Sequence, residues 1–189
     1  GVVTATALRS GTPIPLAILA GLAVGLVAGF TNGILITKVQ INPFITTLGM
    51  MGIARGAALA VTKGTTVAGL PQEFFVYGQG KLFDIFNLII IALIIILIGD
   101  ILMRRSAIFR QVYYVGGNEE AARLSGINVD RMKIAVYTLS GIFAALAGIL
   151  SVSRFTVADP GAGTGEELRI IAACIIGGCS LQGGRGTVI

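Results

Sequence analysis

A segment without a single charged side chain, from Leu16 to Ile36, constrains the fold of this chain more than any other feature. An α-helix over these positions rises roughly 30 Å, which matches the hydrocarbon core of a bilayer. The composition agrees, because 54% of the residues are hydrophobic and 12% are charged, whereas soluble domains carry about 25% charged residues. The chain is therefore predicted to be an all-α, polytopic bundle of transmembrane helices.

Charged and turn-forming residues divide the 189 residues into five apolar segments. We expect one transmembrane domain, 1–189, incomplete at both ends, with spans at about 16–36, 43–62, 85–103 and 134–152. The fifth segment, 167–178, is too short to cross a bilayer, so it is predicted to be a half-helix or re-entrant segment. We expect the chain to be the central piece of a longer protein.

A glycine stripe runs along the first predicted span. Glycine recurs there at every fourth residue, at Gly21, Gly25, Gly29 and Gly33. On a helix these positions share one face, and small residues in this register let two membrane helices approach closely. We predict that this face packs against another helix of the bundle, although membrane helices are also generally rich in glycine.

The second predicted span begins at Asn42-Pro43, an N-cap residue followed by proline at the first helical position. Arg55 lies within this span, and a charge at membrane depth normally faces protein or water. Arg55 and Asn42 are therefore candidate residues of a translocation pathway. Two structural interpretations of Arg55 remain open, namely an ion pair that holds helices together and a side chain that reaches the interface from a tilted helix.

Lysine and arginine are unevenly divided between the two sides of the predicted membrane. The positive-inside rule therefore places the 104–133 loop in the cytoplasm, on the side that carries Lys38, Arg104, Arg105, Arg110, Arg123, Arg131 and Lys133. The segments 63–86 and 153–166 then lie outside, and the aromatic residues of the first suit a surface helix at the level of the lipid headgroups: Phe74, Phe75, Tyr77, Phe83 and Phe86. This topology accounts for the net charge of +5 without a nucleic-acid partner.

The sequence contains no histidine, which excludes Ser-His and Cys-His catalytic units and histidine metal sites within it. Cys174 and Cys179 lie in an apolar stretch at a spacing typical of neither zinc nor redox sites, so we expect small packing residues. The sequence also lacks a G-x-x-x-x-G-K-[ST] string, so this chain does not bind nucleotide by the P-loop mechanism. We therefore predict no catalytic residue, no metal and no cofactor.

The 104–133 loop contains the signals of a short helix. Asn118 is a good N-cap, Glu119 and Glu120 suit the first turn, and Gly126 suits a left-handed end. A helix of about two turns must be held by packing. We expect the small alanine face of this helix to dock into a groove of another protein, with Ala122 packed tightly against that partner. Taken by themselves, the residues of this loop fit an ordinary connection between two spans equally well.

Three strings in the sequence carry a resemblance to a known family. Glu120-Ala121-Ala122 followed by Gly126 resembles the EAA signature of ATP-binding-cassette (ABC) importer permeases. The fuller string GGNEEAARLSGINVDRMKI, with NPFITTLGMMGIARG at 42–56 and AGTGEELRIIAACIIGGCSLQGGRGTV at 162–188, resembles the ribose-type monosaccharide permeases. The resemblance implies that an ATPase-coupling helix is formed by Asn118, Glu119, Glu120, Ala121, Ala122, Arg123, Leu124, Ser125 and Gly126.

The same resemblance implies a function and a set of partners. The expected function is the membrane-spanning permease subunit of an ABC importer that moves a ribose-like monosaccharide across the bacterial inner membrane. The implied partners are an ATPase subunit, a periplasmic sugar-binding protein, membrane lipid and a second permease subunit in a homodimer. The family usually has an acidic residue where Arg169 stands, and Val and Thr where Cys174 and Cys179 stand.

Two other classes of protein were weighed against this expectation. A secondary transporter or channel for a small polar solute needs an ionisable coupling residue within the spans, for which Arg55 and Asp100 are the candidates. An intramembrane enzyme needs paired carboxylates or an activated nucleophile within the spans. The acidic residues lie almost entirely at segment ends, which disfavours an enzyme.

Overall fold

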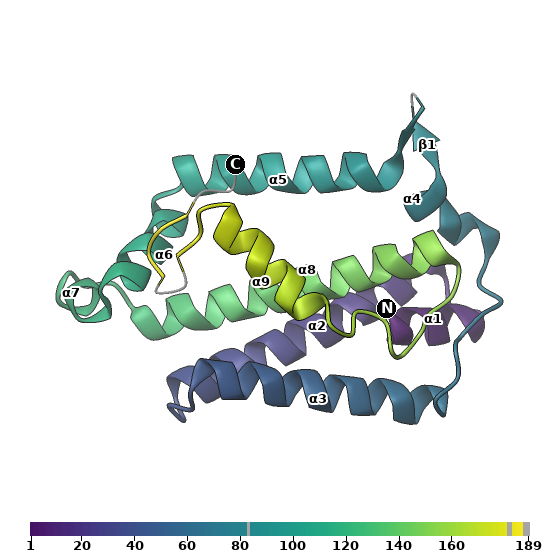
Figure 1. Cartoon of the computed structure of the whole chain (residues 1–189), viewed down its shortest axis with the longest axis horizontal. Coiled ribbons are helices and arrows are strands. Elements are labelled where there is room, and N and C mark those ends of the chain that lie inside the picture. The colour runs from purple at the N-terminus through teal and green to yellow at the C-terminus, as the bar shows by residue number, and fades with distance from the viewer. Residues whose placement is uncertain (83, 181–182, 187–189) are drawn as a thin grey trace. The chain divides into compact units, whose positions relative to one another are not determined.

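Proline and asparagine set the starts of the long helices. The computed structural model describes residues 1–82, 84–180 and 183–186 (Figure 1). In α2 (Ile14–Thr37) the N-cap is Pro13, and a further proline follows in the first turn. In α3 (Pro43–Thr62) the Asn42 side chain accepts a hydrogen bond of 2.9 Å from the amide of Phe44. The start predicted at Asn42-Pro43 is therefore confirmed.

Four helices of the described residues are long and apolar enough to cross a membrane. They are α2, α3, α5 (Asn87–Arg105) and α8 (Val129–Phe155), and the all-α class is confirmed. The helix α8 begins at Val129, before the fourth span predicted at about 134–152, and the bounds of that span stay a prediction. The first turns of α8 therefore include Arg131 and Lys133, which the sequence analysis placed in the preceding loop.

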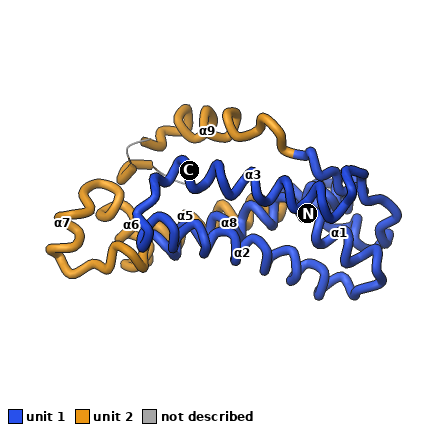
Figure 2. Tube along the Cα trace, turned by 90° about the horizontal axis from the view of Figure 1, so that it is seen from below, with its two compact units in different colours: residues 1–89, 133–162 blue, residues 90–132, 163–189 orange. Residues whose placement is uncertain are grey.

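The chain divides into two compact units (Figure 2). Unit 1 comprises Gly1–Ile89 and Lys133–Ala162, and unit 2 comprises Ile90–Met132 and Gly163–Ile189. Each unit is described by itself below. The assignment of residues 1–189 to one permease domain stays a prediction.

In unit 1 the glycine face of α2 lies directly against α8 (Figure 1). A Cβ atom on Gly25 would collide with the carbonyl oxygen of Gly141, and one on Gly29 with the carbonyl oxygen of Tyr137. Further along α2, a Cβ on Gly33 would lie 2.8 Å from the Cα of Ile134. Gly21 lies against Ile149 and Thr4 of α1 (Val2–Arg9). Backbone meets backbone along this seam because the glycines have no side chains.

The largest apolar cluster of the described residues lies in unit 1, where α1 meets α2, α8 and the loops that follow α3 and α8. Phe74 is fully buried at its centre. Its other buried members are Ala5, Leu8, Ala17, Val67, Leu70, Ile149, Val152 and Ala158. Residues from three regions far apart in sequence, 5–17, 67–74 and 149–158, thus form one core at this end of the unit.

The surface helix expected in the 63–86 segment is confined to residues 72–79. The structure has a 3-10 turn η1 (Gln72–Phe75), one α-turn α4 (Val76–Gln79) and a hairpin of β1 (Lys81–Leu82) and β2 (Ile85–Phe86). Pro71 precedes the first turn, and Gly80 ends the second with an extended backbone. Phe83, one of the predicted interfacial aromatics, lies outside the described residues.

Unit 2 contains the remaining helices α6 (Ala107–Gly117), α7 (Glu119–Leu124) and α9 (Glu166–Ile176), together with most of α5. No helix was expected from the sequence at α6. α9 occupies the predicted half-helix, is 11 residues long and begins at Glu166. None of its residues is buried in the part of the chain that the structure describes.

Candidate functional site

The short helix predicted in the 104–133 loop forms as α7. The Asn118 side chain accepts a hydrogen bond of 3.0 Å from the amide of Ala121, and Glu119 and Glu120 occupy the first turn. At the other end Gly126 has a φ of +82°, and its amide donates to the carbonyl oxygen of Arg123 at 3.0 Å. A left-handed residue at this position favours glycine and ends the helix.

Ala122 is turned into the chain rather than toward a partner, which corrects the expectation for this residue. It is buried in an apolar cluster with Val115 of α6 and Val129 of α8. An ion pair of 2.8 Å between Arg123 and Asp130 closes the same side. The helix needs this cluster, because six residues are too few to be stable alone.

The opposite face of α7 is open. Leu124 is the most accessible large apolar residue of this region, with 86% of its surface exposed. Around it the exposed residues of α7 are Glu119, Glu120, Ala121 and Arg123, and Ser125 and Gly126 follow the helix, also exposed. An apolar side chain surrounded by polar ones is suited to insertion into a complementary groove. We refer to Glu119, Glu120, Ala121 and Leu124 as the α7 outer face.

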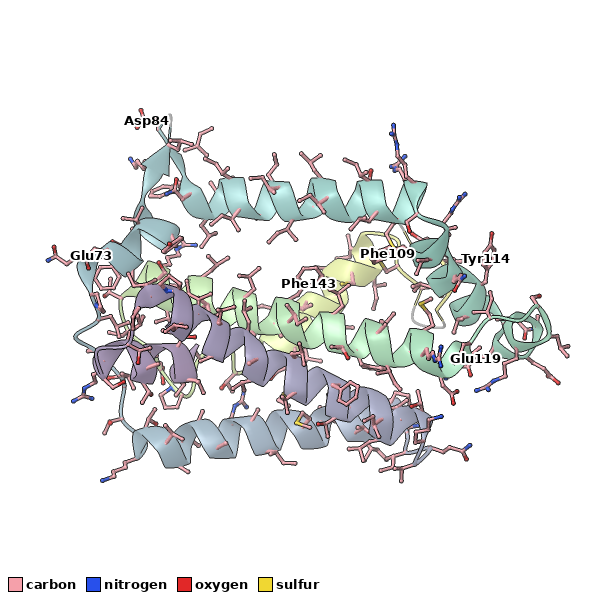
Figure 3. The ribbon with its side chains drawn as sticks, turned by 180° about the vertical axis from the view of Figure 1, so that it is seen from behind. Glu73, Asp84, Phe109, Tyr114, Glu119 and Phe143 are labelled. Carbon is pink, nitrogen blue, oxygen red and sulfur yellow. The ribbon has the colours of Figure 1, made fainter. Side chains whose placement is uncertain are left out.

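Sequence reasoning missed Tyr114, which lies on α6 with 61% of its surface exposed. Figure 3 shows Tyr114 and Glu119 at the same end of unit 2. The apolar residues Phe109, Val112 and Val115 recur every three positions, with Arg110 and Gln111 between them, and this helical spacing is the signal of an amphipathic helix that would have located Tyr114.

The two candidate pathway residues are not brought together. Asn42 is exposed and caps α3, whereas Arg55 lies half-buried along the same helix. Thirteen positions on one helix separate them by about 20 Å. On α3, a Cβ atom at Gly49, Gly52 or Gly56 would meet nothing within 4 Å among the described residues. A pathway role for either residue stays a prediction.

Asp100, a candidate coupling residue of the secondary-transporter interpretation, forms an ion pair of 2.8 Å with Arg104 near the end of α5. This is the i, i+4 pair that its spacing predicts. A carboxylate held in this way at a helix end is poorly placed to bind and release a coupling ion in mid-membrane, so the ion pair disfavours that interpretation.

The two predicted outer loops are joined into one platform in unit 1. Val67 and Ala158 exchange two backbone hydrogen bonds of 2.9 Å. The buried Ser153 hydroxyl donates to the carbonyl oxygen of Phe74 at 2.7 Å, and the Gln79 side chain donates to that of Arg154 at 2.8 Å. We call residues 63–82 and 153–162 the outer platform; Glu73 lies on it (Figure 3).

The residues with metal-binding or redox chemistry are scattered. No group of three or more His, Cys, Asp or Glu residues within 1–82, 84–180 and 183–186 is arranged to hold a metal ion. Cys174 is exposed on α9, so the packing role expected for it is not seen in unit 2, and Cys179 is half-buried. Arg169 forms an ion pair of 3.0 Å with Glu166 on the same helix.

Comparison with known proteins places these features in a family. A family model described as branched-chain amino acid transport system / permease component matches residues 1–189. The ribose import permease protein RbsC of Escherichia coli K12 is 40% identical over 177 residues, which cover 92% of this chain and 55% of that protein. The L-arabinose transport system permease protein AraH of the same organism is 38% identical over 188 residues, covering 100% of this chain and 57% of that protein.

A relative named for a different substrate is the autoinducer 2 import system permease protein LsrC of Yersinia pseudotuberculosis. It is 38% identical over 183 residues, which cover 97% of this chain and 52% of that protein. The chain thus spans about half the length of these curated relatives. No solved structure matches it significantly. The resemblance drawn from the sequence motifs is confirmed, and the chain, a multi-pass membrane protein, belongs to the permease family described as branched-chain amino acid transport system / permease component.

Proposed function

We propose that this chain is part of the membrane subunit of an ABC importer that carries a monosaccharide across the bacterial inner membrane. The observation that carries the proposal is α7, a capped helix fixed by its own buried cluster with its other face open. It occurs in a chain 40% identical over 177 residues to a ribose import permease. ATP hydrolysis belongs to a separate ATPase subunit, since the sequence has no phosphate-binding loop of the P-loop type.

The proposed mechanism begins when the ATPase subunits bind ATP and close. The α7 outer face lies in a groove of the ATPase and moves with it, and the membrane helices tilt so that the pathway opens to alternate sides. The tight α2–α8 seam moves as one body, because its backbone contacts leave no room for sliding. Two permease subunits form a homodimer, and the open glycine face of α3 is suited to close contact with a helix outside this chain.

The outer platform receives a periplasmic sugar-binding protein in this proposal. Hydrogen bonds between its two loops give it a fixed shape before the partner arrives. A preformed surface loses less conformational entropy on binding than two independent loops.

Co-purification and transport of the full-length permease test this function. The permease is expressed with its neighbouring ATPase and reconstituted in liposomes with a panel of purified sugar-binding proteins. We expect a stable complex with the ATPase, and uptake of one monosaccharide that requires both ATP and one binding protein. Uptake driven by an ion gradient without the ATPase would instead support a secondary transporter.

Accessibility labelling tests the orientation. Ser125 is exposed beside α7, and Thr66 is exposed on the outer platform. In a background with Cys174→Ser and Cys179→Ser, we expect an impermeant thiol reagent to label Thr66→Cys in intact spheroplasts and Ser125→Cys only in inverted vesicles. The two variants control for each other, and the reverse pattern would invert the topology.

A further inference from the structure

The end of α6 is in backbone contact with the loop that follows α9. A Cβ atom on Gly116 would collide with the amide nitrogen of Gly184 and would lie 2.9 Å from its Cα. In the other direction, a Cβ on Gly184 would lie 2.5 Å from the nitrogen and 2.6 Å from the Cα of Gly117. Two main chains approach this closely only where no side chain stands between them. We call Gly116, Gly183 and Gly184 the glycine contact; all three lie in unit 2.

The glycine contact is tied to α9 by a short series of main-chain hydrogen bonds. The Cys179 amide donates to the carbonyl oxygen of Cys174 in the last turn of α9 at 3.0 Å. The next residue, Ser180, donates to the carbonyl oxygen of Arg185 at 3.0 Å and accepts from the amide of Gly183 at 3.1 Å. These main-chain bonds hold Gly183 and Arg185 next to the C-terminal end of α9.

On its other side the glycine contact adjoins α7. The amide of Asn118, the α7 N-cap, donates to the carbonyl oxygen of Tyr114 at 3.1 Å. One residue before Gly116, the Val115 side chain packs against Ala122 of α7. A displacement of α7 therefore moves the last turn of α6, and with it Gly116 and Gly117.

We propose that Gly116 and Gly184 are positioning residues that pass the displacement of α7 on to α9. This inference rests on the proposed function, since it needs an ATPase that moves α7. The physical basis is that a main-chain contact has no rotatable side chain to absorb a movement. α9 is an apolar half-helix with Leu168 and Ile176 exposed, and it has no buried residue among those described that would hold it back.

Neighbouring glycines provide a matched test. Gly116→Ala places a methyl group against the backbone of Gly184, whereas a Cβ on Gly117 meets nothing within 4 Å. Both residues are in the last turn of α6 and neither has a positive φ, so the helix preference for alanine over glycine applies to both. The full-length permease with its ATPase is reconstituted, and sugar uptake, ATP hydrolysis and ATPase co-purification are measured for both variants.

For Gly116→Ala we expect uptake per ATP hydrolysed to fall about tenfold, a size typical of lost coupling between two sites. Co-purification of the ATPase stays normal, because the α7 outer face is unchanged. Gly117→Ala keeps the wild-type ratio. Equal ratios in the two variants, or loss of ATPase binding in Gly116→Ala, would overturn the transmission role. Failure of the wild-type permease to bind an ATPase at all would instead refute the proposed function.

A distance measurement keeps the inference testable if Gly116→Ala does not fold. Spin labels are attached to Ser125→Cys beside α7 and to the native, exposed Cys174 of α9, in full-length permease whose other cysteines, Cys179 included, are replaced. If the glycine contact transmits movement, the distance between the labels at positions 125 and 174 should be the same in the nucleotide-free and ATP-trapped states. A change in this distance on ATP binding would show that α7 moves without α9 and would overturn the proposal.

Discussion

Leu124→Asp is expected to abolish sugar uptake and to release the ATPase from an otherwise folded permease. Leu124 is 86% exposed on the α7 outer face, so the substitution disturbs nothing inside the chain. In the proposed complex the Leu124 side chain is buried in a groove of the partner. A carboxylate buried there needs a positive partner, and the only cationic residue of α7 is Arg123, which already pairs with Asp130. Loss of a central apolar anchor costs about 2 kcal/mol or more, which is roughly a 30-fold loss of affinity.

The measurement is ATPase co-purification together with sugar uptake in proteoliposomes, and Leu124→Met is the control because it keeps the apolar volume. Ala122→Glu is an informative contrast. It places an unpaired charge in the cluster of Val115 and Val129 and should therefore lower the stability of the folded loop itself. Normal co-purification and uptake in Leu124→Asp would move the ATPase contact away from α7.

Gly25→Leu and Gly29→Leu are expected to prevent normal assembly of the permease. A side chain at Gly25 would meet the carbonyl oxygen of Gly141 and lie 2.5 Å from the Cβ of Ala145. At Gly29 the first side-chain carbon would lie 2.9 Å from the Cα of Thr138. The two helix backbones have to separate, and overpacking of this kind costs about 1–3 kcal/mol or more.

The yield of monodisperse protein and its thermal unfolding in detergent measure this effect. Ala23→Leu is the matched control, because Ala23 lies on the same helix with an exposed side chain. We expect both glycine variants to unfold several degrees below the wild type, or not to be recovered, and Ala23→Leu to behave like the wild type. Unchanged unfolding temperatures in both glycine variants would show that the α2–α8 seam does not depend on close approach.

Local signals were enough to predict the long helices and the ends of α7. A span needs only length and the absence of charge, both of which can be counted along Leu16–Ile36. The α7 helix is bounded by Asn118 and Gly126, which act on backbone groups within three or four residues of themselves. These interactions are local, so the sequence alone determines them. The spacing of the glycines likewise determines which face of α2 lacks side chains.

The direction in which a residue faces was decided by contacts between segments far apart in the chain. Ala122 and Leu124 lie two positions apart on α7, and nothing local distinguishes which faces a partner. The tertiary structure turns Ala122 inward because Val115 and Val129 arrive from two other helices, and this leaves Leu124 exposed.

The same reason governs the two loop contacts that carry the proposals. Val67 meets Ala158 across 91 positions, and Gly116 meets Gly184 across 68. The sequence by itself determined the long helices, the caps of α3 and α7 and the family, because those depend on neighbours along the chain. Only the tertiary structure decided which faces are buried and which glycines touch, because such pairings depend on how the whole backbone folds back on itself.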